Sequence, residues 1–158
     1  MAGEASSESS DRENQPVNAM SCRPGRWAVI LGVGLDLVEV ERFERDVTRH
    51  GDGFLEELFS PREIAYCQGM RWPYPFYAAR FAAREALFKA LGTGRDGSMS
   101  WHDAEVHREA SGKPFLVLSG ETRRVAEGMG VTRVHLSLTH TEGYAGATVV
   151  LEGGETRR

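Results

Sequence analysis

The sequence lacks the features that mark a secreted, membrane-spanning or thiolate-metal protein. Its 158 residues include two cysteines, Cys22 and Cys67, which are far apart and in no metal-ligand spacing. We therefore expect neither a disulfide framework nor a thiolate zinc site. No apolar run approaches the roughly 20 residues that span a bilayer, and Met1–Asn18 lacks the apolar core of a secretory signal. These absences favour a cytoplasmic protein that does not enter a membrane.

The chain also lacks an excess of positive charge. Lys and Arg total 19 against 23 Asp and Glu, so the formal net charge is −4, which argues against a nucleic-acid binder. Hydrophobic residues at 41% and charged residues at 27% are ordinary for one globular domain of this length. The Ser-, Glu- and Asn-rich start predicts a disordered extension over residues 1–26, a domain over 27–152 and a frayed tail over 153–158.

Hydrophobic periodicity predicts a mixed α+β protein. A capping-box sequence at Ser60-Pro61-Arg62-Glu63 predicts a helix start, and prolines at 73 and 75 predict a chain break before a long central helix. We expect helices over Val38–Arg49, Phe54–Leu58, Phe76–Leu91 and Gly120–Met129, and strands over Trp27–Leu35, Ala104–Arg108, Phe115–Leu118, His135–Thr139 and Tyr144–Leu151.

Asp36 is the first candidate for chemistry. It follows an apolar strand in which Gly32 and Gly34 permit another group to approach the backbone closely. The glycine pattern lacks the third glycine of a dinucleotide fingerprint. The alternative is structural, because Asp36 and Glu39 have the spacing of a capping box for the next helix.

Glu85 is the second candidate, because it shares one face of the central helix with Phe81 and Phe88. Desolvating a carboxylate costs several kcal/mol, which a bound cation offsets. The alternative is a solvated pair with Lys89. Two carboxylates without nearby His or Cys suit magnesium, which usually completes its coordination with phosphate oxygens.

Cationic and polar groups for a phosphate ligand are available, each with a structural alternative. The cations are Arg80, Lys89 and Lys113, although Gly112-Lys113-Pro114 also reads as an ordinary hairpin turn. His140, in Ser137-Leu138-Thr139-His140-Thr141, is either a ligand residue or a structural histidine at a strand end. No Ser-His-acid arrangement can be identified from sequence order.

A basic stripe runs along the first predicted helix. Arg42, Arg45 and Arg49 are spaced three and four residues apart, so they share one helix face. Such a face suits an acidic partner helix. The alternative is a solvated face, since Glu41 and Glu44 are neighbours.

Taken in order, these segments resemble the short holo-acyl-carrier-protein synthase class of 4′-phosphopantetheinyl transferases. The matching stretches cover essentially Trp27 to Glu152 and are Gly32–Glu39, Arg80–Ala86 through Lys89 to Gly92-Thr93-Gly94, Ser111–Pro114 and Ser137–Thr141. The resemblance implies a small antiparallel sheet packed against a long central helix. It also implies Mg²⁺-dependent transfer of 4′-phosphopantetheine from coenzyme A to a serine of an apo acyl carrier protein, which releases adenosine 3′,5′-bisphosphate.

The resemblance also implies roles for individual residues. Asp36 and Glu85 would bind magnesium and, with Lys89, form the catalytic group. Arg42, Arg45 and Arg49 would face the acidic helix of the carrier. The coenzyme A site would be lined by Arg80, Lys89, Gly92, Gly112, Lys113, Pro114, Ser137, His140 and Thr141.

The family's short members assemble as homotrimers with shared sites. Asp36, Glu85 and Lys89 would then come from one chain, and Lys113, Pro114 and His140 from its neighbour. Arg84 departs from the family's usual Lys and offers phosphate a planar fork instead of a point charge. Two other functions remain open: a non-catalytic trimeric module that binds a carrier protein or a nucleotide, and hydrolysis of the coenzyme A pyrophosphate by water.

Overall fold

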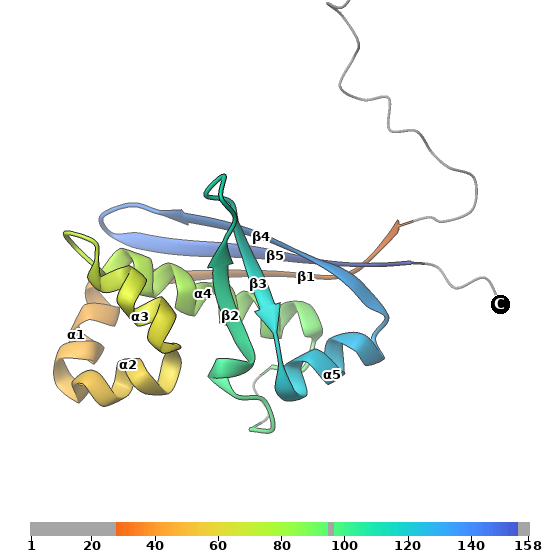
Figure 1. Cartoon of the computed structure of the whole chain (residues 1–158), viewed down its shortest axis with the longest axis horizontal. Helices are drawn as coiled ribbons and strands as arrows, with labels where there is room; N and C mark the ends of the chain where they lie inside the picture. The colour runs from red at the N-terminus through yellow and green to blue at the C-terminus, as the bar shows by residue number, and fades with distance from the viewer. Residues whose placement is uncertain (1–27, 95–96, 155–158) are drawn as a thin grey trace, which may run out of the picture.

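The computed structural model describes residues 28–94 and 97–154 (Figure 1). The predicted extension over residues 1–26 lies outside these ranges. The helices are α1 (Val40–His50), α2 (Asp52–Leu58), α3 (Pro61–Gln68), α4 (Tyr74–Leu91), the 3₁₀ turn η1 (Trp101–Asp103) and α5 (Gly120–Gly128). The strands are β1 (Ala28–Glu39), β2 (Ala104–Arg108), β3 (Pro114–Leu118), β4 (Val131–His140) and β5 (Tyr144–Gly154).

The main sheet has the order β1-β5-β4 and is antiparallel throughout. Helix α4 runs along one face of this sheet, as Figure 1 shows, and its alanines and leucines pack on buried β5 and β4 residues such as Val149 and Leu136. Strands β2 and β3 form a separate two-stranded sheet, the β2–β3 hairpin. The predicted α+β class, with a small antiparallel sheet on a long central helix, is confirmed.

Two glycines on β1 bring α4 close to the sheet. A Cβ at Gly32 would overlap the carbonyl oxygen of Ala90, and a Cβ at Gly34 would overlap that of Ala86. Only a residue without a side chain permits this contact between backbones. The sequence predicted that another group approaches Gly32 and Gly34 closely. In the structure, that group is the backbone of helix α4.

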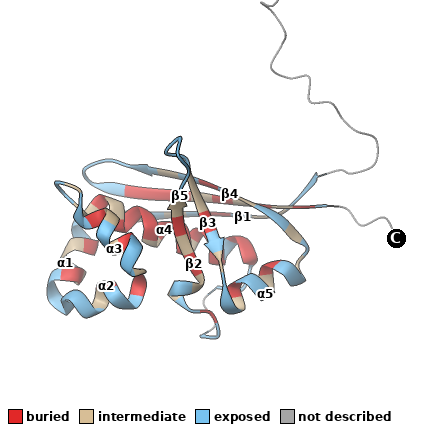
Figure 2. Cartoon of the chain, viewed as in Figure 1, coloured by how far each residue is buried: buried red, intermediate tan, exposed pale blue. Residues whose placement is uncertain are grey.

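Helices α1, α2 and α3 pack on the N-terminal half of α4 in a second apolar cluster. Val40, Phe43, Leu58, Phe59 and Tyr77 are almost fully buried in it, and Figure 2 shows α4 buried along most of its length. The predicted start of α3 is confirmed, because the Ser60 hydroxyl accepts from the Glu63 amide and the Glu63 carboxylate accepts from the Ser60 amide.

The structure also corrects several predicted boundaries. Strand β1 continues to Glu39, so Asp36 lies inside the strand, and the alternative of a capping box at Asp36 is wrong because α1 has no side-chain cap hydrogen bond. Helix α4 begins at Tyr74, since Pro75 fits the first turn, where its missing N–H has no intrahelical partner. Strand β5 extends into the segment expected to fray, with Gly154 opposite Ala28. Among the described residues, no helix has both the length and the apolar character needed to cross a membrane.

Candidate functional site

Asp36 faces α4 from β1 and pairs with Lys89. The Lys89 Nζ donates to Asp36 Oδ1 at 2.8 Å and to the Leu35 carbonyl oxygen at 3.1 Å. The Asp36 side chain is 14% exposed and that of Lys89 is 53% exposed. Lys89 thus reaches from the helix to the strand, and one edge of the pair remains open to solvent.

Asp36 and Glu85 line the same hollow, which has a volume of about 440 Å³. Its wall combines β1, α1, α4, Phe54 of α2 and Tyr144 at the start of β5. Within residues 28–94 and 97–154 there is no cluster of three or more His, Cys, Asp or Glu side chains placed to hold a metal ion. Four carboxylates line the hollow, because Glu39 and Asp46 join Asp36 and Glu85 in its wall. The predicted pair Asp36 and Glu85 is a donor set that fits Mg²⁺, because Mg²⁺ keeps waters and takes substrate oxygens for its other positions.

The basic stripe lies beside this hollow. Arg42 is part of the wall, whereas Arg45 and Arg49 are exposed further along α1. Arg45 donates to Glu41 at 3.0 Å, but both side chains are largely exposed, so this pair contributes little stability. Arg45 can therefore exchange its contact with Glu41 for one with a partner at low cost.

The Gly112-Lys113-Pro114 segment forms the tip of the β2–β3 hairpin, which projects beyond the main sheet in Figure 1. The tip is closed by the Glu109 amide, which donates to the Lys113 carbonyl oxygen at 2.9 Å, and by Gly112 at a φ of 87°. Lys113 is exposed and is absent from the wall of the hollow. One chain by itself does not bring Lys113 to Asp36 and Glu85.

The Ser137–Thr141 segment ends β4 and enters the β4–β5 turn. Ser137 and Thr139 are exposed on the sheet face opposite α4, whereas the His140 ring lies 4.9 Å from the Phe76 ring of α4. The Thr141 amide closes the turn by donating to the Tyr144 carbonyl oxygen at 2.7 Å. The alternation of faces along β4 therefore extends to His140.

Gly92 ends α4 in the left-handed conformation, with a φ of 73°, close to Lys89. The predicted stop of the central helix is therefore correct. Gly92 is exposed, and a Cβ at this position would meet nothing within 4 Å. Its requirement for glycine is conformational.

Two arginines of α4 point into the protein interior. Arg80 is 2% exposed, donates to the Phe76 carbonyl oxygen at 3.2 Å and stacks on Tyr66. An external phosphate cannot reach Arg80 in this conformation, so the prediction that it meets coenzyme A is not supported. Arg84 is fully buried and grips the Glu63 carboxylate with both terminal nitrogens. Its planar fork therefore binds a carboxylate of the protein.

The sequence predicted Glu63 only as a capping-box residue of α3. It did not predict that Glu63 is the buried carboxylate that pairs with the arginines of α4. A cap position is normally at the surface, whereas Glu63 is 1% exposed. The signal was the arginine pair on a helix otherwise rich in alanine, which needs a carboxylate once the helix is buried.

Titration of one buried and one half-buried group follows from their surroundings. Burial raises the pKa of the Cys67 thiol to about 11, so this cysteine is a neutral core residue near pH 7. For Glu105, burial alone would raise the pKa, but hydrogen bonding from Ser60 and His107 outweighs it and lowers the pKa. Glu105 is therefore ionised at the base of the β2–β3 hairpin.

Comparison with known proteins identifies the relatives of this fold and site. Residues 32–149 match the family model of the 4′-phosphopantetheinyl transferase superfamily. The holo-[acyl-carrier-protein] synthase of Koribacter versatilis is 50% identical over 124 residues, which are 78% of this chain and 99% of that protein. That of Solibacter usitatus is 45% identical with the same coverage.

Solved structures agree with these sequence relatives. Holo-[acyl-carrier-protein] synthase from Neisseria meningitidis superposes with a TM-score of 0.72 at 32% identity, covering 78% of this chain and 98% of that one. The Helicobacter pylori synthase, solved in complex with coenzyme A, gives a TM-score of 0.67 at 30% identity, covering 75% and 98%. The chain therefore belongs to the 4′-phosphopantetheinyl transferase superfamily and, within it, is an enzyme of the holo-[acyl-carrier-protein] synthase type.

Proposed function

We propose that this protein transfers 4′-phosphopantetheine from coenzyme A to a serine hydroxyl of an apo acyl carrier protein in a Mg²⁺-dependent reaction. The observation that carries the proposal is that Asp36 and Glu85, from different elements, line one hollow beside Lys89 and Arg42. The relatives are synthases of holo acyl carrier protein, and one was solved with coenzyme A. A cytoplasmic location remains a prediction from the composition.

Asp36 and Glu85 would hold the metal ion, which when bound supplies positive charge to the pyrophosphate oxygens. An ammonium group has three donors, and the described contacts of Lys89 direct two of them to Asp36 and the Leu35 carbonyl. The remaining donor of this half-exposed side chain can bind a phosphate oxygen. Lys89 thus orients one metal ligand and neutralises charge on the substrate.

The reaction needs one bond formed and one broken. The serine oxygen attacks the phosphorus that carries pantetheine, the pyrophosphate P–O bond breaks, and adenosine 3′,5′-bisphosphate leaves with the bridging oxygen. The serine proton is released. Transfer of this kind depends mainly on positioning and charge neutralisation, which the carboxylates and cations of this hollow supply.

The carrier protein would dock on α1. Arg42, Arg45 and Arg49 present positive charge beside the hollow, so an acidic carrier helix would be steered to the place where its serine must enter. Asp46 lies in the same wall and limits how far an acidic partner can penetrate.

The complete site would need a second copy of the chain. On the sheet face opposite α4, edge strand β1 exposes Val33, Leu35 and Leu37 by 61–66%, an apolar surface that association would bury. A homotrimer that covers this face would bring the neighbour's Lys113, Pro114 and His140 toward coenzyme A bound at Asp36 and Glu85. Gly92, Gly112, Ser137 and Thr141 would line the same site.

The test is intact-mass spectrometry of an apo acyl carrier protein incubated with this protein, coenzyme A and Mg²⁺, with a parallel sample in excess EDTA. We expect the mass gain of one phosphopantetheine, suppressed by EDTA. A folded, oligomeric protein that modifies none of several carriers would contradict the proposal. A mass gain that resists EDTA would contradict the metal requirement alone.

A further inference from the structure

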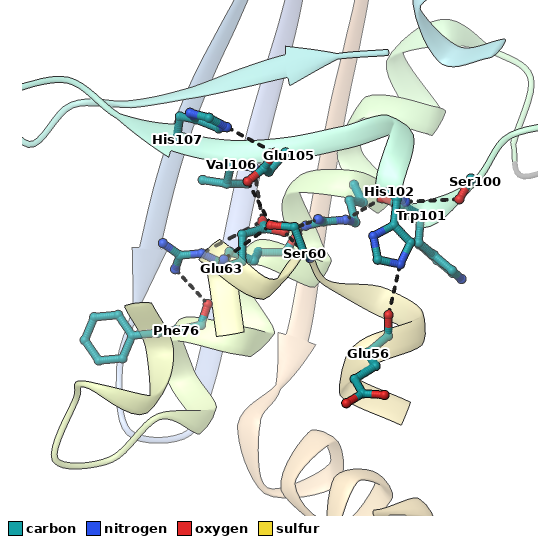
Figure 3. Close-up of polar contacts among 12 residues, drawn as sticks. Glu56, Ser60, Glu63, Phe76, Ser100, Trp101, His102, Glu105, Val106 and His107 are labelled. Atoms are coloured by element: carbon teal, nitrogen blue, oxygen red, sulfur yellow. Dashed lines mark hydrogen bonds and ion pairs between the residues drawn. The ribbon is translucent and has the colours of Figure 1, made fainter. Parts of the chain in front are cut away.

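The buried ion pair between Glu63 of α3 and Arg84 of α4 lies outside the wall of the hollow that holds the proposed active site. Figure 3 shows Glu63 at the centre of a polar group that includes Ser60, Glu105 and Val106. Glu63 is 1% exposed and Arg84 is fully buried. An ion pair removed from water in this way is costly unless every charge finds partners.

Both partners are well satisfied. Arg84 Nη2 and Nη1 donate to the two Glu63 carboxylate oxygens at 2.5 and 3.1 Å. Glu63 Oε1 also accepts from the Val106 amide at 3.0 Å, and Oε2 accepts from the Ser60 amide at 3.1 Å. Arg84 Nε donates to the Trp101 carbonyl oxygen at 2.9 Å, at the start of η1. The network therefore links two helices to the segment that leads into β2.

The segment fixed by this network is the base of the β2–β3 hairpin. Trp101 precedes β2 and Val106 lies within it. Beside them, the Ser60 hydroxyl donates to Glu105 at 2.8 Å, which adds a side-chain bond to the same strand. Because β2 and β3 form a sheet of their own, the hairpin takes no ladder hydrogen bonds from the main sheet. Its direction is therefore set by side-chain anchors of this kind together with the packing of Val106 and Leu116 in the main core.

Helix α4 is held in a different way. Its backbone lies on β1 at Gly32 and Gly34, and its small side chains pack on β5. Loss of the Glu63–Arg84 pair would therefore leave Asp36 and Glu85 near their present positions. The hairpin, whose tip carries Lys113, would move more.

We propose that Glu63 and Arg84 are positioning residues for coenzyme A binding, because they fix the β2–β3 hairpin and so the place of Lys113 in the neighbouring subunit's site. The inference rests on the proposed function, since it assumes that Lys113 meets a phosphate of coenzyme A. A small rotation at the hairpin base displaces its tip, and a charge-assisted contact to phosphate depends steeply on distance.

The test compares steady-state kinetics of Glu63→Gln and Arg84→Lys with those of the wild-type enzyme. The matched control is Glu127→Gln, which disrupts an Arg–Glu pair of the same chemistry that is largely exposed on α5. For Glu63→Gln we expect the KM for coenzyme A to rise about tenfold. A rise of this size corresponds to the loss of one well-placed charge-assisted contact, here that of Lys113 with phosphate. The kcat and the KM for the carrier should change by less than about threefold. Arg84→Lys retains the charge and should show a smaller rise.

A second readout does not depend on activity. Amides of β2 and of the hairpin turn should exchange with deuterium faster in Glu63→Gln, whereas amides of α4 should keep their wild-type rates. Where a single variant does not fold, the double change Glu63→Leu with Arg84→Met removes both members of the hydrogen-bonded pair, while Arg80, whose Nε lies 4.0 Å from Glu63, keeps its hydrogen bond to the Phe76 carbonyl oxygen. It should also show the raised KM, because Val106 loses its acceptor.

Folded variants with lower melting temperatures but unchanged KM for coenzyme A would overturn the inference and leave the pair a purely structural role. Equal acceleration of exchange in α4 and in the hairpin would also overturn it. If the wild-type protein transfers nothing to any carrier, the proposed function fails instead. The exchange comparison then still decides whether the pair anchors the hairpin.

Discussion

Two of the ion pairs that helix α4 makes share a charge type but differ in burial. Lys89 pairs with Asp36 beside the hollow and is 53% exposed, whereas Arg84 pairs with Glu63 and is fully buried. The two cations are five residues apart, so at about 100° per residue they point about 140° apart around the helix. The Lys89–Asp36 pair stays open to a ligand, and the Arg84–Glu63 pair has its hydrogen bonds directed to the protein.

This difference teaches how one helix serves both chemistry and architecture. Lysine retains donors and reorients at low cost at a half-exposed position, so it suits a pair that must also meet substrate. Arginine matches a carboxylate with a rigid fork and suits a pair that must stay fixed. The arginine at position 84 therefore serves internal fit, because Arg84 is fully buried and is not part of the wall of the hollow.

The largest expected effect is a loss of catalysis when either of the two proposed metal ligands, Asp36 or Glu85, is removed. Asp36→Ala and Glu85→Ala should each lower kcat about a thousandfold or more, because each removes half of the carboxylate donor set. Circular dichroism and the melting temperature should remain close to wild type. The control is Glu57→Ala, which removes an exposed carboxylate from α2. Near-normal transfer by both site variants would show that the hollow does not hold the metal.

The next prediction compares one variant expected to lose mainly stability with one expected to lose mainly activity. Arg84→Met should lower the free energy of unfolding by about 3–5 kcal/mol, since the buried Glu63 carboxylate loses its hydrogen-bonded cation and keeps only Arg80, whose Nε is 4.0 Å away. Lys89→Met should cost less than about 1 kcal/mol, because that pair is partly solvated, yet it should slow transfer strongly. Urea denaturation measures both changes. Equal losses of stability would break the distinction drawn between the two pairs.

The sequence predicted the elements well because their signals are local. Capping at Ser60, the stop at Gly92 and the helical period of α4 each depend on neighbouring residues. The meeting of Asp36 and Glu85 in one hollow was also foreseen, from a carboxylate on an apolar helix face and another beside a glycine-rich strand.

What the sequence did not reveal depends on contacts between distant segments. The burial of Arg80 and Arg84 requires Glu63 from another helix, and that partner was visible only as a cap residue. The extension of β1 past Asp36 depends on pairing with β5, with Asp36 opposite Ala147. A helix-like pattern from Val38 onward concealed this pairing.

The smallest expected effect tests how α4 is held against β1. Gly34→Ala would place a methyl group against the Ala86 carbonyl, so the helix must shift, at a cost of about 1–3 kcal/mol typical of overpacking. A Cβ at Gly53 would meet nothing within 4 Å, so Gly53→Ala is the matched control and should be neutral or slightly stabilising. Because the shift would move α4 away from Asp36, transfer by Gly34→Ala should fall even where the protein is fully folded. A loss of stability with normal transfer would mean that Lys89 can follow the helix and still reach Asp36, so that the glycines serve packing alone.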